Sequence, residues 1–216
     1  MFKFLSHKER INRNAEKQLE LYSRPSVDFF VLITISASLA TLGLALDNSA
    51  IIIGAMVVAP LVTPIFGFSL YLILLKPKGI AESLFSILTG TILSVATSAL
   101  FGFLILLIDG QSIFSTTEIL SRTKPDLLYF IIALLSGLAG AFAYVRPKLS
   151  ERIVGIAISA AIIPPLAVMG LSIAMQNWTI LMASGFLFLL NFAGICFGSI
   201  IMFLILGFGK EENLEI

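Results

Sequence analysis

Six long apolar runs divide the chain, and each is long enough to cross a lipid bilayer. A helix needs about 20 apolar residues to span the roughly 30 Å of hydrocarbon in a membrane. The runs cover roughly residues 27–46, 49–75, 80–108, 127–145, 152–175 and 179–208. Because the runs are continuous and lipid tolerates no open sheet edges, they predict an all-α polytopic membrane protein with six transmembrane helices.

The composition supports a chain that lies mostly within lipid. Hydrophobic residues make up 58% and charged residues 12% of the 216 residues, whereas a soluble domain has about 25% charged residues. A soluble fold this apolar would expose much hydrophobic surface to water. The composition therefore excludes a soluble globular enzyme, a disordered chain and a nucleic-acid-binding protein.

The positions of lysine and arginine predict the orientation of the spans. If the chain crosses six times, twelve of these residues lie on one side, and only Arg122 and Lys124 lie on the other. Positive residues favour the cytoplasmic side, so both termini should be cytoplasmic. The segments outside the spans are then a cytoplasmic head (1–26), an external loop (109–126) and a cytoplasmic tail (209–216). The head is expected to form an amphipathic surface helix or a partly ordered tail. In the external loop, Ser115 and Glu118 could form a capping box for a short helix.

An internal repeat with an offset of 101 residues relates the two halves of the chain. The segment from Ser49 aligns without gaps on the segment from Ser150, so that Pro64 meets Pro165, and Ser83 meets Ser184 in the following span. Each copy (27–108 and 127–208) holds three spans, and because three is odd the second copy enters from the opposite face. Such inverted repeats are typical of secondary transporters.

Paired prolines near the middle of spans two and five predict broken helices. Pro60 and Pro64 lie in span two, and Pro164 and Pro165 lie in span five. Each proline removes a backbone hydrogen bond and disfavours helix at the preceding residue. Breaks are therefore expected around Thr63–Pro64 and Pro164–Pro165, with a solute site between them. The alternative is a pair of kinks that serve packing.

The polar residues within the spans limit the chemistry. No ionisable side chain lies near the middle of a span, which argues against a proton-coupled carrier, a voltage sensor and an intramembrane protease. Cys196 lies in an apolar run and His7 in the head, so neither a metal site nor a cofactor is expected. Hydroxyls, amides and freed carbonyls could hold a small neutral or anionic solute, or a partly dehydrated cation. No enzymatic activity is expected.

The candidate site combines the proline breaks with nearby polar and small residues. Gly54 and Gly155 are expected to allow close approach of a neighbouring helix or a solute, and the Asn191 amide should either clamp a helix or face the site. Small residues spaced four apart, such as Gly194 and Gly198, could instead serve helix packing. The candidate substrate-binding residues are Ser38, Thr41, Gly54, Ala59, Pro60, Thr63, Pro64, Gly155, Ala160, Pro164, Pro165 and Asn191.

Two segments resemble a family of bacterial and archaeal membrane proteins named for a domain of unknown function, DUF389. They are SLATLGLALDNSAIIIGAMVVAPLVTPI from Ser38 and GIAISAAIIPPLA from Gly155, followed by Asn191. The resemblance covers about residues 24–208, with Val62 where methionine is usual. It implies a six-span membrane core without the soluble domain that precedes the core in many members. It implies no substrate.

Three functions remain open on the sequence alone. The first is a secondary transporter or facilitator of a small solute or ion, with its site at the midplane between the repeats. The second is an oligomeric channel whose pore is lined by broken helices. The third is a membrane scaffold that moves no solute. In each case the expected location is a prokaryotic inner membrane, and the expected partners are the bilayer and further copies of the chain.

Overall fold

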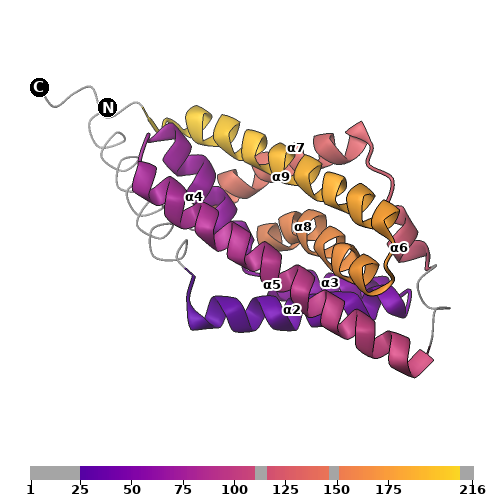
Figure 1. The fold of residues 1–216 in the computed structure, drawn as a ribbon. Coiled ribbons are helices and arrows are strands. Elements are labelled where there is room, and N and C mark those ends of the chain that lie inside the picture. The colour runs from indigo at the N-terminus through magenta and orange to yellow at the C-terminus, as the bar shows by residue number, and fades with distance from the viewer. Residues whose placement is uncertain (1–24, 110–115, 146–150, 210–216) are drawn as a thin grey trace, which may run out of the picture.

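The computed structural model describes residues 25–109, 116–145 and 151–209, with only the helical backbone described for 109 and 151–160. The described part is helical throughout, and the helices are labelled as in Figure 1. The expected surface helix of the head lies outside the described residues. The helices are α2 (Val27–Ala45), α3 (Ser49–Val58), α4 (Val62–Ile73), α5 (Pro77–Asp109), α6 (Thr117–Ser121), α7 (Leu127–Val145), α8 (Glu151–Ala174) and α9 (Trp178–Leu206).

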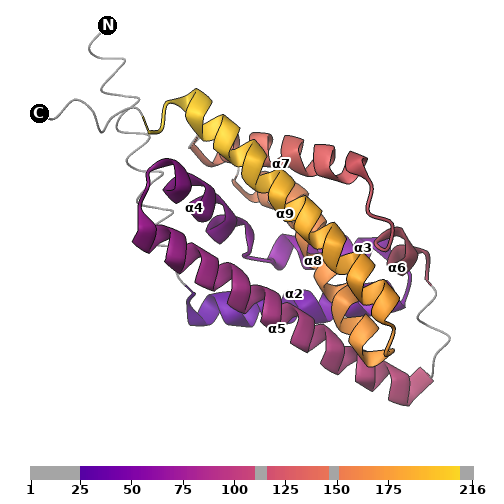
Figure 2. The ribbon, with the colours of Figure 1, turned by 45° about the horizontal axis from the view of Figure 1, so that its top comes forward.

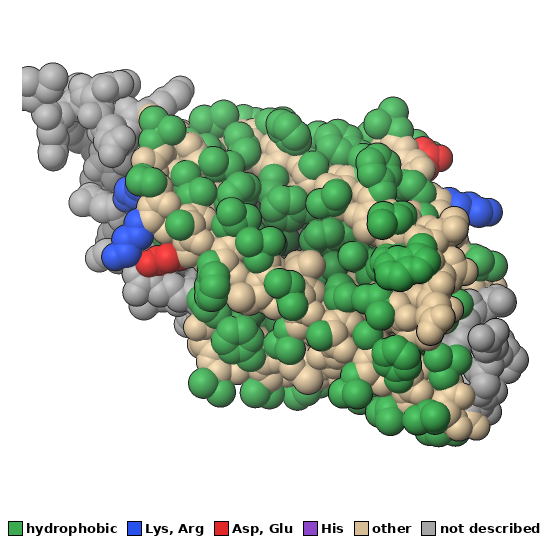
Figure 3. All heavy atoms as spheres, in the orientation of Figure 1, with side chains coloured by type: hydrophobic (Ala, Val, Ile, Leu, Met, Phe, Trp, Pro, Cys, Tyr) green, Lys and Arg blue, Asp and Glu red, His purple; other side chains and the backbone are tan. Residues whose placement is uncertain are grey.

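The length and hydropathy of the helices are those of an integral membrane protein. Within the described residues, α2, α5, α7 and α9 are each long and apolar enough to span a bilayer, and the bent pair α3–α4 counts as a fifth span. The apolar part of α8 that is fully described, Ala161–Ala174, is shorter. On the face shown in Figure 3 the middle is covered by hydrophobic side chains, and the charged side chains lie at the two ends.

The helices run between two ends of the molecule (Figure 1). One end holds the start of α2, the turn between α4 and α5 and the end of α9. The other end holds the α2–α3 turn, the end of α5, the short helix α6 and the α8–α9 turn. Lys76 and Lys78 therefore lie at the opposite end from Arg122 and Lys124.

The span of residues 49–73 is broken as expected, but at a different position. The two helices α3 and α4 meet at an angle of 53° across Ala59–Leu61. Ala59 has extended backbone (φ −68°, ψ 123°) because it precedes Pro60. The break expected at Thr63–Pro64 is wrong: these are the second and third residues of α4. The first turn of a helix has no intrahelical acceptors for its N–H groups, so a proline there removes no hydrogen bond.

The expectation that span five is broken is also wrong, since α8 runs through Pro164 and Pro165 without interruption. Pro165 has no N–H, so the Ala161 carbonyl four residues earlier has no donor within the helix. The Asn191 amide of α9 supplies one, with its Nδ2 2.8 Å from the Ala161 oxygen. The Ser184 hydroxyl donates to the Pro165 carbonyl at 2.8 Å. The Asn191 amide thus replaces the donor that Pro165 removes, and Ser184 adds a second contact from α9 to the backbone of α8.

Three of the described turns between helices share the same backbone: one is at Asp47, which has a φ of 51°, and the other two lie 101 residues apart. Leu75 between α4 and α5 has a φ of 51°, and Gln176 between α8 and α9 has a φ of 53°. The N–H of the next residue donates to the helix in both turns, from Lys76 to Tyr71 and from Asn177 to Ser172. These bonds satisfy carbonyls at the helix C-terminus, so both connections turn back tightly into an antiparallel neighbour.

Glycines bring α7 and α9 into close contact (Figures 1 and 2). A Cβ added to Gly198 would lie 2.1 Å from the Leu134 carbonyl oxygen, and one added to Gly137 would lie 2.3 Å from the Ile195 carbonyl oxygen. A Cβ at Gly194 would lie 2.8 Å from Ala133 Cβ. The helix backbones therefore touch, as small residues spaced four apart allow, and the packing interpretation of these residues is confirmed.

Gly54 has a different environment from the one expected. It lies on the exposed face of α3, and an added Cβ would meet no atom within 4 Å. The close approach of a neighbouring helix expected at this position is therefore wrong. A side chain at residue 54 would project away from the packed interior, because the buried residues of α3 are Ile52, Ala55 and Met56. Gly155, its counterpart in the repeat, lies in the part of α8 for which only the backbone is described.

Candidate functional site

A partly open cavity of about 200 Å³ lies among α6, α7, α8 and α9. It begins at α6 and the first turns of α7, at one end of the molecule. At 1.5 Å per residue, Asn191 lies about 20 Å along α9 from its first residue, close to the middle of that helix. The cavity therefore reaches from an end of the bundle towards its centre. Its lining residues are Ser121, Arg122, Tyr129, Ile132, Ala161, Pro165, Leu187 and Asn191.

Asn191 is the polar residue at the deep end of this cavity. Its side chain is 3% exposed, and its Nδ2 donates to the Ala161 carbonyl. Its Oδ1 has no hydrogen-bond partner among the described residues. A buried acceptor left unpaired costs about 1–3 kcal/mol. A bound molecule that donates a hydrogen bond to Oδ1 would recover that energy, so Asn191 can both hold α8 and recognise a solute.

The rest of the cavity wall is mainly apolar. Ile132, Ala161, Pro165 and Leu187 form the part between Asn191 and the outer residues. Ligand sites commonly combine an apolar wall with a few placed polar groups that fix orientation. Of the eight lining residues, Arg122 alone carries a full charge at neutral pH. A solute that reaches Asn191 would therefore leave the charged part of the cavity behind.

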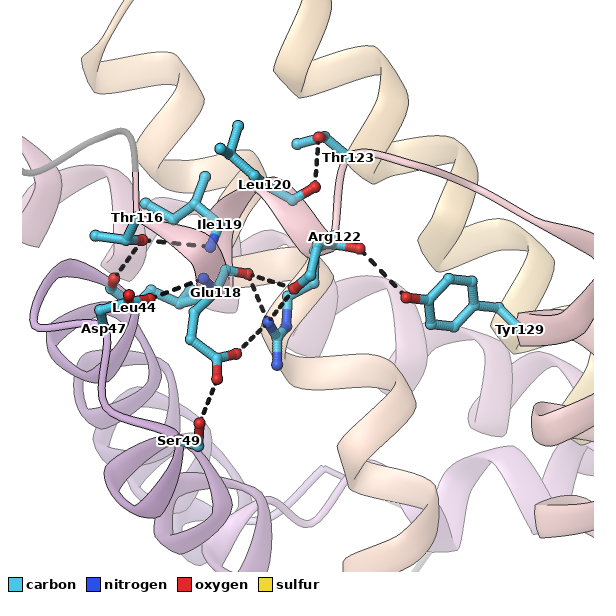
Figure 4. A network of polar contacts seen from close by, with 11 residues as sticks. Leu44, Asp47, Ser49, Thr116, Glu118, Ile119, Leu120, Arg122, Thr123 and Tyr129 are labelled. Atoms are coloured by element: carbon cyan, nitrogen blue, oxygen red, sulfur yellow. Dashed lines mark hydrogen bonds and ion pairs between the residues drawn. The ribbon is translucent and has the colours of Figure 1, made fainter.

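The outer wall of the cavity is tied to the α2–α3 turn by polar contacts (Figure 4). The Thr116 hydroxyl donates to the Leu44 carbonyl at 2.9 Å, and the Glu118 N–H donates to the Asp47 carboxylate at 2.8 Å. The Ser49 hydroxyl donates to the Glu118 carboxylate. These contacts join α6 to a turn about 70 residues earlier in the chain. The short helix is therefore held against the bundle, and α6 can act as a fixed wall of the cavity.

Thr116, rather than Ser115, caps the short helix. The Thr116 hydroxyl accepts a hydrogen bond from the Ile119 N–H at 3.3 Å, and Glu118 lies in the first turn. The expected helix is confirmed, but a capping box that begins at Ser115 is wrong. Ser115 itself lies outside the described residues. Glu118 is directed to Ser49 and Arg122 rather than back to the cap.

Arg122 and Glu118 form an ion pair four residues apart within the outer wall. The same Arg122 nitrogen also donates to the Glu118 carbonyl and to the Ser121 hydroxyl. Hydrogen bonds from Ser49 and Arg122 hold the pKa of the Glu118 carboxyl below its ordinary value of 4.5. The positive charge beside the cavity is thus balanced by a neighbouring carboxylate.

The attachment of α6 should weaken in acid. A carboxyl with a lowered pKa in the folded protein contributes stability above its ordinary pKa, and this contribution is lost as the pH falls through the folded value. When the pH is lowered below 4.5, we expect the thermal unfolding midpoint in detergent to decrease more for the wild type than for Glu118→Gln. Ser49→Ala should reduce this difference. Identical pH curves for the wild type and Glu118→Gln would contradict the role given to this carboxylate.

The structure brings together only some of the candidate residues. Pro165 and Asn191 line the cavity together with Ala161. Ser38 and Thr41 instead donate their hydroxyls to carbonyls of their own helix, at Thr34 and Ala37. Pro164 is buried in α8 beside Pro165. The residues at the bend of span two are buried or half-buried but do not line this cavity; they are Ala59, Pro60, Thr63 and Pro64. The surroundings of Gly155 and Ala160 are not described.

The outer wall of the cavity was not predicted from the sequence. Arg122 contributed only to the predicted orientation of the spans, and no role was expected for Ser121 or Tyr129. A signal was nevertheless present, because polar residues cluster both at 47–49 and at 116–122, two segments expected on the same side of the membrane. Leu187 and Ile132 gave no such signal, since they are two apolar residues among many.

A family model for a domain of unknown function, DUF389, matches residues 56–197. The chain belongs to this family. The matched part begins in α3 and ends in α9, so it contains the bend of span two, both prolines of α8 and Asn191. The cavity lined by residues 121–191 therefore lies wholly within the family's domain.

The chain is also similar to an uncharacterized protein of Methanocaldococcus jannaschii, with 30% identity over 179 residues. The matched part covers 82% of this chain and 54% of that protein. The chain thus spans about half the length of this relative. No solved structure matches the chain.

Proposed function

We propose that this DUF389 protein is a secondary transporter or facilitator that carries a small uncharged polar solute across the membrane. The cavity that ends at Asn191 would be the outward-facing part of its pathway. The observation that carries the proposal is the Asn191 Oδ1, which has no partner among the described residues and is buried about halfway along α9 in a cavity that extends to one end of the bundle. A residue that served only to clamp α8 would not need a cavity beside it.

The arrangement of helices supports six spans in two inverted repeats. α2, α3–α4 and α5 correspond in order to α7, α8 and α9. The turns before α5 and α9 have matching backbone at positions 101 residues apart, Leu75 and Gln176, and the turn at Asp47 shares this backbone. On this proposal α8 is the sixth span, although its fully described apolar part is short. Inverted repeats give a transporter two related halves around a central site.

The proposed orientation places both termini in the cytoplasm and α6 outside. Lys76 and Lys78 lie at the end of the molecule opposite to Arg122 and Lys124. The twelve-to-two distribution of lysine and arginine then follows the positive-inside rule. The location in a prokaryotic inner membrane, and assembly with further copies of the chain, belong to the same proposal.

The charges around the cavity favour an uncharged solute. Arg122 is paired with Glu118 in the outer wall, and the inner wall offers the Asn191 amide among apolar side chains. An ion that reached Asn191 would lose its hydration without meeting an opposite charge, which is costly. A small alcohol or amide would retain a hydrogen bond to Oδ1 and place its carbon atoms against Leu187 and Ile132. We propose no chemical change of the solute and no cofactor.

Solute flux into proteoliposomes tests the proposal. Glycerol and urea gradients should cause swelling several-fold faster than in protein-free liposomes, with a rate that saturates as the solute concentration rises. Acetate and Na⁺ serve as charged comparisons and should not enter faster than in the control. A flux that rises without saturation would favour the channel alternative. No acceleration for any of the four solutes would contradict the transport proposal.

A further inference from the structure

The two proline-bearing spans differ in shape although the sequence repeat relates them. Span two is bent by 53° between α3 and α4, whereas α8 is a continuous helix. Pro64 in the first copy corresponds to Pro165 in the second. One structure therefore contains two conformations of the same kind of unit, one bent and one straight.

A hydrogen bond distinguishes the two units. The Ser184 hydroxyl donates to the Pro165 carbonyl in the straight unit. The equivalent residues, 101 positions earlier, are Ser83 and Pro64. Ser83 is fully buried, with 0% of its surface exposed, and its hydroxyl has no partner among the described residues. The bent unit thus retains the donor of this bond but does not form it.

The cavity also has an equivalent position in the first half of the chain. Its inner wall consists of Ala161, Pro165, Leu187 and Asn191. The residues 101 positions earlier are Pro60, Pro64, Ser86 and Gly90.

This equivalent position is filled by side chains in the structure. A Cβ added to Gly90 would lie 2.7 Å from Leu61 Cδ2 and 3.0 Å from the tip of the Phe29 ring. Leu61 is 1% exposed and Phe29 is 6% exposed. Leu61 lies at the bend itself, and Phe29 lies in the first turn of α2, at the end of the molecule opposite to α6. The second position is therefore closed from the end of the molecule opposite to the one at which the first is open.

We infer that Pro60, Pro64, Ser86 and Gly90 form a second, cytoplasm-facing half of the solute site, closed in this structure by Phe29 and Leu61. In the alternate state the halves exchange conformations: span two straightens, Ser83 donates to the Pro64 carbonyl, and α8 bends at 160–162, the counterparts of the break at Ala59–Leu61. Straightening moves Leu61 away from Gly90 and opens the second half while the Asn191 cavity closes. This inference rests on the proposed function, and the second half takes the same uncharged solute, because its polar side-chain group is the hydroxyl of Ser86.

Matched cysteine variants can detect the exchange without any solute. In a Cys196→Ala background, Leu187→Cys reports on the outer half and Ser86→Cys reports on the inner half. A membrane-impermeant maleimide should label residue 187 from the α6 side only and residue 86 from the cytoplasmic side only. Met169→Cys is a control away from both halves, and its labelling should not change when Phe29 and Leu61 are replaced.

Shortening Phe29 and Leu61, the two side chains that close the inner half, provides the decisive comparison. Phe29→Ala combined with Leu61→Ala should raise the labelling rate at residue 86 at least about fivefold and lower the rate at residue 187, because the two openings belong to competing states. This response should not depend on the Asn191 side chain, so it should be the same in an Asn191→Leu background. A protein that merely became leaky would be labelled faster at both positions, and that result would overturn the inference. So would faster labelling at residue 86 with an unchanged rate at residue 187.

The labelling result is separable from the flux result. Reciprocal labelling without flux of any tested solute would support the two half-sites while contradicting the proposed transport. Saturable flux without reciprocal labelling would support transport through the Asn191 cavity while overturning the exchange between halves.

Discussion

Replacing Gly198 by leucine should prevent the native packing of α7 against α9. The first added carbon would lie 2.1 Å from the Leu134 carbonyl oxygen and 2.9 Å from the Leu138 nitrogen. These are backbone atoms of a helix, so they cannot move aside as a flexible side chain can. Overpacking of this kind costs about 3 kcal/mol or more. We expect the thermal midpoint of the purified protein in detergent to fall by more than 10 °C, or the variant to be recovered only as aggregate.

Gly54→Leu is the matched control for this prediction. It makes the same change on an exposed face of α3, where an added Cβ meets no atom within 4 Å. Its free energy of unfolding should stay within about 0.5 kcal/mol of the wild-type value. Equal loss of stability in both variants would show that membrane insertion, rather than the α7–α9 contact, determines the effect. A stable Gly198→Leu protein would contradict the packing described here.

Replacing Asn191 by leucine should abolish transport while costing little stability. The variant loses the hydrogen bond to the Ala161 carbonyl and the free Oδ1 acceptor. Hydrogen bonds between membrane helices contribute about 1 kcal/mol each, so the protein should remain folded. The solute would lose its polar contact in the cavity, and a bulkier apolar side chain would replace the group that recognises it. We expect saturable flux to fall at least about tenfold.

Ser184→Ala is the control for the structural part of this change. Ser184 makes the same kind of contact, from α9 to a carbonyl of α8, at 2.8 Å. It is fully buried and does not line the cavity. Both substitutions therefore remove one contact between α9 and α8, but only one alters the cavity. The comparison separates the clamping of α8 from the recognition of a solute.

The sequence predicts the helices well because their ends depend on local signals. Charges, prolines and Asn caps interrupt the apolar runs, and Asn48 and Asn177 do cap α3 and α9. The extended residue before Pro60 is also a local effect, so a break in span two could be expected. The position of the break could not be predicted, because a proline such as Pro64 disrupts the interior of a helix but is tolerated in its first turn. The sequence does not show which of these two places Pro64 occupies.

The continuity of α8 could not be predicted in the same way. The donors that stabilise it come from Ser184 and Asn191, which lie 19 and 30 residues from the carbonyls they contact. A hydrophobic pattern does not reveal which helix face such residues occupy. The outer wall of the cavity was missed for a related reason. Glu118 meets Ser49 across 69 residues of sequence, and neither the repeat nor the proline motifs pair these two residues.

The candidate site was therefore predicted in part. Asn191 and Pro165 were expected and lie together in the cavity. Their neighbours in the structure are residues of α6 and α7, whereas the analysis of the sequence placed them opposite the prolines of span two. The repeat nevertheless links the two regions, because residues 60, 64, 86 and 90 are the counterparts of the inner wall. The repeat relates the two proline-bearing spans in sequence, but in the structure one is bent and the other is straight, so their counterpart residues have different surroundings.

The most direct test of transport through the Asn191 cavity is the initial rate of glycerol uptake into proteoliposomes. The wild type, Asn191→Leu and Ser184→Ala should be reconstituted at equal protein content and with the same orientation. We expect saturable uptake for the wild type and for Ser184→Ala, and uptake at the protein-free rate for Asn191→Leu. Wild-type uptake in a folded, correctly inserted Asn191→Leu protein would contradict this expectation.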